Sequence, residues 1–148
     1  MTVMPRSPAK PSLLLIAIAC FLNSGCGADG PKTFEVSGTV TFDGKPVPAG
    51  RVDFFPDFAT GNDGPQGFAT IKDGAFDTRK GGQGHAGGAI VIRIEGFDGK
   101  SDNPKFPGTP IFVTHQINRE LPKEASVQNL EVPASAATDL VVLPKSKS

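Results

Sequence analysis

The fold is decided by Ala89-Ile-Val-Ile-Arg-Ile-Glu-Gly-Phe97, the most regular stretch of the chain. In it Ile90, Ile92 and Ile94 alternate with Val, Arg and Glu. Because successive side chains of a β-strand point to opposite faces of the sheet, a period of two is typical of a strand with one buried face. The stretch therefore predicts a strand whose isoleucines face the core.

Extended segments of the same kind lie on both sides of this strand. From residue 33 to residue 42, Phe and Val alternate with Glu, Ser and Thr, which indicates a half-buried strand. Asp73-Gly74 separates two short extended runs, and Asp-Gly is a strong hairpin signal. Residues 116–124 are ambiguous and leave open a helical turn before Pro122. The other extended segments that we expect are 51–55, 66–72, 75–78, 111–114, 127–132 and 138–143.

Turn-forming residues separate these segments. The chain has 18 glycines and 14 prolines, and it has neither Trp nor Tyr. Residues 57–65 and 98–110 are rich in Gly, Pro, Asn and Asp and are expected to be surface loops. The sequence has no sustained helical period. Seven or eight short strands with turns every ~8 to 12 residues predict an all-β fold, an antiparallel β-sandwich.

The N-terminal segment has the pattern of a bacterial export signal. Arg6 and Lys10 precede the apolar run 13–22, and small residues follow it. A basic start, a short apolar run and small residues before a cut are the features of a signal peptide. The run is shorter than the about 20 apolar residues that span a bilayer, so we expect a signal and not a membrane-spanning helix.

The end of this segment, Ser24-Gly25-Cys26, resembles a lipobox. In that motif signal peptidase II would cut between Gly25 and Cys26, and Cys26 would carry acyl chains such as palmitate. Several such chains hold a protein stably on a membrane. Asn23 stands where the lipobox favours Leu, and Cys20 is a weaker second candidate for lipidation. The alternative is an ordinary cleaved signal that releases a free secreted protein.

The domain organisation follows from this signal. We expect a signal peptide at 1–25, an anchor and loose tether at 26–32, a β-sandwich domain at 33–144 and a polar tail at 145–148. The chain left after cleavage has about 120 residues, the size of one domain. Both cysteines lie in or next to the signal, so no disulfide and no thiolate metal site is expected in the folded part.

The charge of the chain argues against one class of partner. Two of the 15 basic residues, Arg6 and Lys10, belong to the signal, which leaves 13 basic against 15 acidic residues. A nearly neutral chain without a basic run gives no support for nucleic-acid binding. Nucleic acid is therefore not among the expected partners.

Three motifs, in order, carry a resemblance to a known family. They are Gly38-Thr-Val-Thr-Phe-Asp-Gly-Lys-Pro-Val-Pro-Ala-Gly-Arg-Val-Asp-Phe-Phe55, Gly67-Phe-Ala-Thr-Ile-Lys-Asp-Gly-Ala-Phe-Asp-Thr78 and Gly88-Ala-Ile-Val-Ile-Arg-Ile94. Over residues 34–97 the chain resembles the carboxypeptidase regulatory-like domain of bacterial surface lipoproteins, with Ile90 where that family usually has an aromatic residue. The resemblance implies a prealbumin-like or immunoglobulin-like sandwich on the cell surface, and it implies no activity.

Few residues are suited to catalysis or to binding a cofactor. Gly82-Gln-Gly84-His-Ala-Gly87 has the spacing G-x-G-x-x-G, but a dinucleotide site needs a helix after the last glycine and a strand is expected here. We expect a glycine-rich loop with positive φ and no nucleotide. His85 and His115 are the only histidines, and no metal-binding or nucleophile motif accompanies them, so we expect them to be exposed in a loop or at a strand end. No catalytic residue, cofactor or metal is predicted.

Two further groups of residues have side chains suited to binding. Both loops contain oxygen ligands of the kind that calcium prefers. They are Asp57, Asn62 and Asp63 in one loop and Asp98, Ser101, Asp102 and Asn103 in the other. Neither loop has the regular calcium-loop spacing, and the same residue types form turns. An aromatic strip could also bind a ligand, but alternating phenylalanines are expected to belong to the core. These phenylalanines are Phe54, Phe55, Phe58, Phe68 and Phe76.

We therefore expect an extracytoplasmic β-sandwich of the cell envelope, anchored to a membrane through lipid on Cys26. It is expected to be a non-enzymatic structural or interaction module, with an envelope protein or a glycan as the partner classes. One alternative is a binding module whose loops 57–65 and 98–110 recognise a glycan, peptide or calcium ion at one end of the sandwich. The other is an enzyme of unrecognised type, which would need His85 or His115 beside carboxylates in a pocket.

Overall fold

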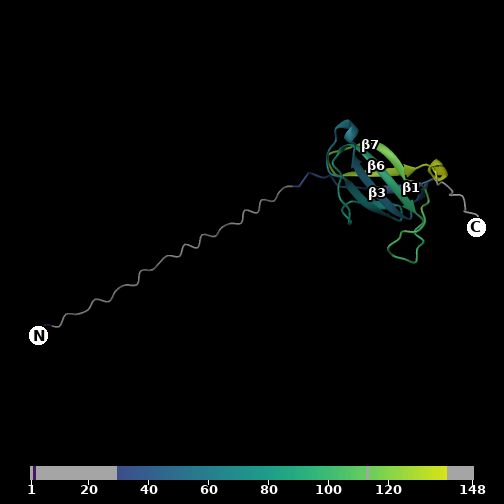
Figure 1. Ribbon diagram of the computed structural model, residues 1–148, viewed down its shortest axis with the longest axis horizontal. Helices are drawn as coiled ribbons and strands as arrows, with labels where there is room; N and C mark the ends of the chain where they lie inside the picture. The colour runs from purple at the N-terminus through teal and green to yellow at the C-terminus, as the bar shows by residue number, and fades with distance from the viewer. Residues whose placement is uncertain (1, 3–29, 113, 140–148) are drawn as a thin grey trace, which may run out of the picture.

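The protein is an all-β molecule, as a computed structural model shows (Figure 1). The structure describes residues 2, 30–112 and 114–139, so the expected signal segment, Cys26 and the tail 145–148 lie outside the described residues. The strands are β1 (Val36–Phe42), β2 (Lys45–Pro46), β3 (Ala49–Pro56), β4 (Gly67–Lys72), β5 (Ala75–Asp77), β6 (Gly88–Phe97), β7 (His115–Leu121) and β8 (Ser126–Val132). Two short 3-10 helices, η1 (Phe58–Thr60) and η2 (Ala134–Asp139), complete the described elements.

The strands form a sheet that curls over on itself into two facing halves. One half has the order β4-β3-β6-β7 and is antiparallel throughout. In the other half, β1 pairs with β2 and β5 on one edge and with β8 on the other. The halves are joined by the β4–β5 hairpin, whose strands share the single register pair Lys72 and Ala75. Beyond that pair the two strands diverge, so the fold is sandwich-like, as the sequence predicts.

Two Asp-Gly turns give the chain its tight hairpins. Asp73 and Gly74 have φ values of 51° and 77°, and Asp43 and Gly44 have φ values of 49° and 73°. Positive φ at both central residues is the geometry of the turn that matches the natural twist of paired strands. Gly reaches this geometry without steric cost, and Asp tolerates it better than most residues. The predicted hairpin at Asp73-Gly74 is confirmed.

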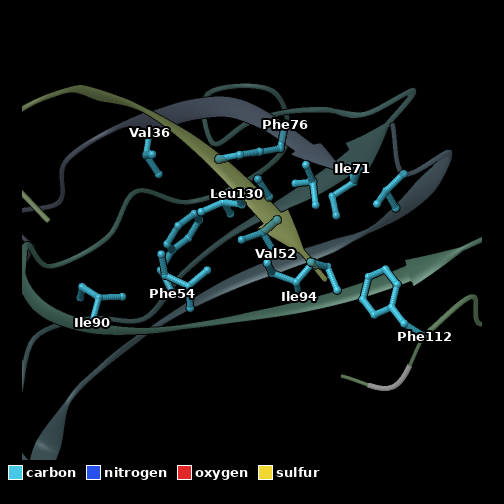
Figure 2. Packing of buried hydrophobic residues seen from close by; sticks show 14 of the residues in the cluster. Val36, Val52, Phe54, Ile71, Phe76, Ile90, Ile94, Phe112 and Leu130 are labelled. Carbon is cyan, nitrogen blue, oxygen red and sulfur yellow. The ribbon is translucent and has the colours of Figure 1, made fainter. Parts of the chain in front are cut away.

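The core lies between the two halves of the sheet (Figure 2). The isoleucines of β6 are buried as predicted, with Ile92 and Ile94 fully inaccessible to solvent. Figure 2 shows Val36, Phe76 and Leu130 of one half facing the residues of β3 and β6, and the ring centroids of Phe54 and Phe76 are 6.0 Å apart. The remaining buried apolar residues are Val40, Val47, Val52, Ala69, Ile71, Ile90, Phe112, Leu121, Val132 and Ala136.

Two predicted strands, 111–114 and 138–143, differ in the structure, and the ambiguous segment 116–124 is a strand over most of its length. Residues 116–124 contain β7 and not a helical turn; its inward positions are His115, Ile117, Arg119 and Leu121, so polar side chains obscure the period of two. The described part of 111–114 is not a strand, because Phe112 bends inward to fill the core beside Phe42, at 5.0 Å between ring centroids. Thr138 and Asp139 belong to η2, and residues 140–143 lie outside the described part.

One strand pair departs from the antiparallel prediction. Strand β8 runs parallel to β1 along its whole length, from Val36 opposite Ser126 to Phe42 opposite Val132. The cause is topological: β7 ends at the end of the molecule where β1 begins, and the chain crosses there to the other half. A strand that starts beside the start of β1 runs in the direction of β1.

The strand register defines two ends of the sandwich. We call one the tether end, because the chain enters the fold there at residues 30–34; it also holds residues 57–65, 81–88 and 122–125. The opposite, far end holds residues 98–112 and η2. Figure 1 shows η1 and η2 on opposite sides of the strands. No helix in the described part of the chain is long and apolar enough to cross a membrane.

Candidate binding surfaces

A cleft of about 620 Å³ lies at the tether end. Its walls come from four short segments, which are residues 31–32, 60–65, 86–89 and the end of β7 with Lys123. Two cations, Lys32 and Lys123, and two anions, Asp63 and Glu120, lie on these walls. The cleft is therefore polar and electrically balanced.

Asn62 holds one wall of the cleft in place. Its side-chain Nδ2 donates to the carbonyl oxygens of Gly87 and Ala89, both at 2.8 Å. Its Oδ1 accepts a hydrogen bond from the backbone N–H of Gly64 at 3.3 Å. All of these bonds are internal to the protein, so Asn62 ties loop 57–65 to β6 and leaves little capacity for a ligand.

The glycine-rich loop lines the cleft with Ala86 and Gly87 and is shaped by close backbone contacts. A Cβ atom at Gly84 would lie 2.6 Å from the carbonyl oxygen of Phe34, and one at Gly82 would lie 2.3 Å from that of Phe68. Gly87 has a φ of 74°, the positive φ predicted for this loop. Strand β6 follows directly, so the G-x-G-x-x-G spacing is not followed by the helix that a dinucleotide site needs.

His85 belongs to this loop, and its side chain is fully buried, which corrects the expectation that it is exposed. Its ring packs between Phe34 and Phe54, with centroid distances of 6.2 and 5.9 Å. The Nδ1 atom accepts a hydrogen bond from the backbone N–H of Gly87 at 2.9 Å. Nε2 therefore carries the proton of the neutral ring, and it has no partner among the described residues.

Burial determines the charge state of His85. Removal from water lowers the pKa of His85 below its usual 6.5, and the negative charge of Glu35 opposes this shift. The Glu35 carboxylate also accepts a short hydrogen bond from the Thr78 hydroxyl, which in turn accepts one from the N–H of Val36 at 3.0 Å. These contacts join the start of β1 to the end of β5. His85 and its neighbours thus hold the tether end of the fold together.

The two acidic loops lie at opposite ends of the sandwich, not at one end as expected. Ala49 is opposite Phe97 and Pro56 is opposite Ile90, so the loops after β3 and β6 are separated by the full length of these strands. The structure gives their carboxylates local roles. Asp57 Oδ1 accepts from the N–H of Ala59 at 3.0 Å and caps η1.

Asp98 has the same kind of role in the second loop. Its Oδ1 accepts from the N–H groups of Lys100 and Thr109, at 2.9 and 3.0 Å, and these bonds lower the pKa of Asp98. Across residues 30–112 and 114–139, no group of three or more His, Cys, Asp or Glu is arranged to hold a metal ion. These contacts are those of turn formers.

The second histidine is distant from the first. His115 opens β7 opposite Ile94, at the far end, whereas His85 is opposite Phe34 at the tether end. His115 is half-buried at a strand end, which agrees with the position expected for it. The two histidines cannot act on one bound molecule.

A second surface, which the sequence did not single out, lies on the outer side of the half formed by β4, β3, β6 and β7. We call it the guanidinium face and define it by Arg51, Asp53, Phe55, Phe68 and Arg93. The guanidinium of Arg51 lies over the Phe68 ring at 4.4 Å, and that of Arg93 lies over the Phe55 ring at 4.8 Å. Such cation–π contacts hold the charged groups in fixed positions.

The two arginines of this face differ in their ion pairs. Arg51 Nε lies 2.7 Å from Asp53 Oδ1, and Gln66 Nε2 reaches the same oxygen at 3.5 Å. Asp53 is consequently only 8% exposed although its side chain is on the outer side of the sheet. Arg93 forms no ion pair within the described residues, and its buried Nε has no hydrogen-bond partner there. It is the free cation of this face.

The phenylalanines are divided between the core and the surface. Phe54 and Phe76 are buried, as expected. Phe55 and Phe68 instead lie under the arginines, and Phe58 is 71% exposed.

No protein-family model, no curated protein and no solved structure matches this chain.

Proposed function

We propose that this protein is a lipid-anchored β-sandwich of the cell envelope that acts as a non-enzymatic interaction module. The motif Ser24-Gly25-Cys26 supports the anchor, since acyl chains on Cys26 would hold the domain at a membrane. The guanidinium face supports the interaction. The separation of His85 from His115 and the burial of His85 argue for binding rather than catalysis.

The observation that carries the proposal is the guanidinium of Arg93, which forms no ion pair with any residue of 30–112 or 114–139. Arg and aromatic residues are enriched among the side chains that dominate binding energies at protein interfaces. The ring of Phe55 restrains Arg93 before any partner arrives, so less side-chain entropy is lost on binding. A planar guanidinium binds a carboxylate through two parallel hydrogen bonds. The partner that fits is an envelope protein that presents an acidic side chain.

The arrangement of the rings distinguishes this partner from a neutral glycan. Sugars commonly stack on open aromatic rings, whereas Phe55 and Phe68 are covered by guanidinium groups. We therefore favour the protein among the two partner classes that the sequence leaves open.

The anchor is tested by labelling cells with a clickable fatty acid. The wild-type protein and a Cys20→Ser variant should take up the label, and Cys26→Ser should not. Label on Cys26→Ser, or none on the wild type, would reject the anchor at Cys26.

The interaction is tested by crosslinking in intact envelopes, followed by capture of the protein. Arg93→Gln should lower the yield of the crosslinked partner by about tenfold, the effect of losing about 1.4 kcal/mol of binding energy. Arg79→Gln is the control, because it removes the same charge from an exposed arginine that pairs with Asp77 at 2.9 Å on the other half of the molecule. Equal yields from Arg93→Gln and wild type would reject the guanidinium face as the partner surface.

A second candidate function rests on the cleft at the tether end. Residues 60–65, from one of the two loops of the alternative binding hypothesis, form one of its walls. A glycan, a short peptide or a calcium ion bound there would raise the melting temperature of the protein. If the ligand is calcium, it should not raise the melting temperature of Asp63→Asn. An unchanged melting temperature of the wild-type protein on addition of calcium rejects calcium as the ligand.

A further inference from the structure

We infer that the tether end docks on the membrane surface, with Phe58 inserted at the boundary between lipid headgroups and acyl chains. This inference rests on the proposed anchor at Cys26 and adds an orientation to it. The occupant of the surface is therefore a lipid bilayer, and the domain stands with its far end away from the membrane.

The first observation is the exposure of Phe58. Its side chain is 71% exposed on η1, which follows the end of β3 at the tether end, and no residue of η1 is buried. Large apolar side chains are mostly buried in water-soluble domains, and an exposed ring at a rim suits the polar–apolar boundary of a bilayer.

The second observation is where the chain enters the fold. The chain enters the fold at residues 30–34, with Pro31 and Lys32 on the wall of the cleft, and six peptide units separate Cys26 from Lys32. Six extended units reach at most about 20 Å. An acylated Cys26 would thus keep the tether end within about 20 Å of the headgroups.

The third observation is the charge pattern beside Phe58. The cleft carries two cations, Lys32 and Lys123, and two anions, Asp63 and Glu120. This balance complements a zwitterionic headgroup, whose phosphate would meet a lysine and whose ammonium group would meet a carboxylate. Docking is then driven by Phe58 and by the high local concentration that the tether creates, and it does not need anionic lipid.

The chain offers a matched control for the test. Phe106 is 65% exposed, nearly as much as Phe58, but it lies in loop 98–110 at the far end. The chain contains no Trp and no Tyr, so a tryptophan introduced at either site is a single fluorescent reporter. Residues 26–148 contain every described element of the fold and one cysteine, Cys26.

The experiment couples residues 26–148 through Cys26 to a maleimide lipid in phosphatidylcholine vesicles, with and without bromine on the acyl chains. In the Phe58→Trp variant, brominated lipid should quench the emission, which should also shift to the blue relative to the uncoupled protein. In Phe106→Trp neither change should occur. Absence of quenching in Phe58→Trp, or equal quenching in both variants, overturns the inference.

The result is separable from the proposed function. Chemical coupling supplies the anchor, so the vesicle experiment does not depend on lipidation in the cell. Quenching without fatty-acid label in cells would retain the docking surface and reject the natural anchor. Label without quenching would retain the anchor and reject the docking surface.

Discussion

Between pH values of about 7.5 and 5.5, acid should destabilise this protein through His85. The imidazole is fully buried, and burial lowers its pKa below 6.5, whereas in the unfolded chain it titrates at about 6.5. Below that pH the unfolded chain binds a proton that the folded chain does not bind. The free energy of unfolding therefore falls as the pH falls.

Proton linkage sets the size of this effect. One histidine with a lowered pKa in the folded state lowers the free energy of unfolding by up to about 1.4 kcal/mol for each pH unit below its unfolded pKa. The loss stops growing once the folded group also titrates. Between pH values of about 7.5 and 5.5 the expected loss is thus up to about 1.4 kcal/mol. Asp77 and Asp98, whose pKa values are lowered, act in a different window. Their contribution is complete above the usual value of 3.8 and is lost only as the pH falls from there through the folded pKa.

The assay is urea unfolding at pH values of about 7.5, 6.5 and 5.5, with the linear dependence of free energy on urea. The wild type and His115→Asn should lose stability across this range, and His85→Phe should not. The variant starts from a lower stability, because the N–H of Gly87 loses its acceptor at a cost of about 1 to 3 kcal/mol. A flat profile in the wild type, or a loss that persists in His85→Phe, would refute the reasoning.

Three further predictions concern stability. Gly50→Ala should lower the free energy of unfolding by about 2 kcal/mol or more, because the new Cβ would lie 2.1 Å from a backbone oxygen of β6. Gly30→Ala is the control and should melt like the wild type, because nothing lies within 4 Å of its new Cβ. Asn62→Ala should cost about 2 kcal/mol in urea unfolding, since two carbonyl groups lose their donor. Phe54→Ala should lower the free energy of unfolding by about 3 to 5 kcal/mol, whereas Phe58→Ala should change it by no more than about 0.5 kcal/mol. Equal losses in the two variants would contradict the burial of Phe54 and the exposure of Phe58.

The sequence predicts the fold wherever a local rule decides it. The alternation of Ile90, Ile92 and Ile94 settles which face of β6 is buried, and Asp73-Gly74 settles the hairpin. The rule weakens where inward positions are polar. In β7 the inward residue Arg119 bonds to Gln128 at 3.0 Å across the open side of the sandwich, so a charge stands where the pattern needs an apolar residue.

Contacts between distant segments could not be predicted in this way. His85 is buried because Phe34 and Phe54 close over it, and these residues are far from it in sequence. The guanidinium face needs β3 and β6 side by side, with Asp53 opposite Arg93. One local signal was available: Arg51 and Asp53 are two residues apart in a strand, so their side chains share a face and can pair.

The two proposed surfaces are compatible because they lie on different parts of the same sheet. Strands β3 and β6 run between the tether end and the far end, and the ten residues of β6 span about 33 Å. If the tether end rests on a bilayer, these strands stand away from it and the guanidinium face is turned to the side. A partner anchored in the same membrane could then reach Arg93 without displacing Phe58. Phe58→Ser should accordingly weaken partner crosslinking only through loss of orientation, whereas Arg93→Gln should weaken it with the orientation retained.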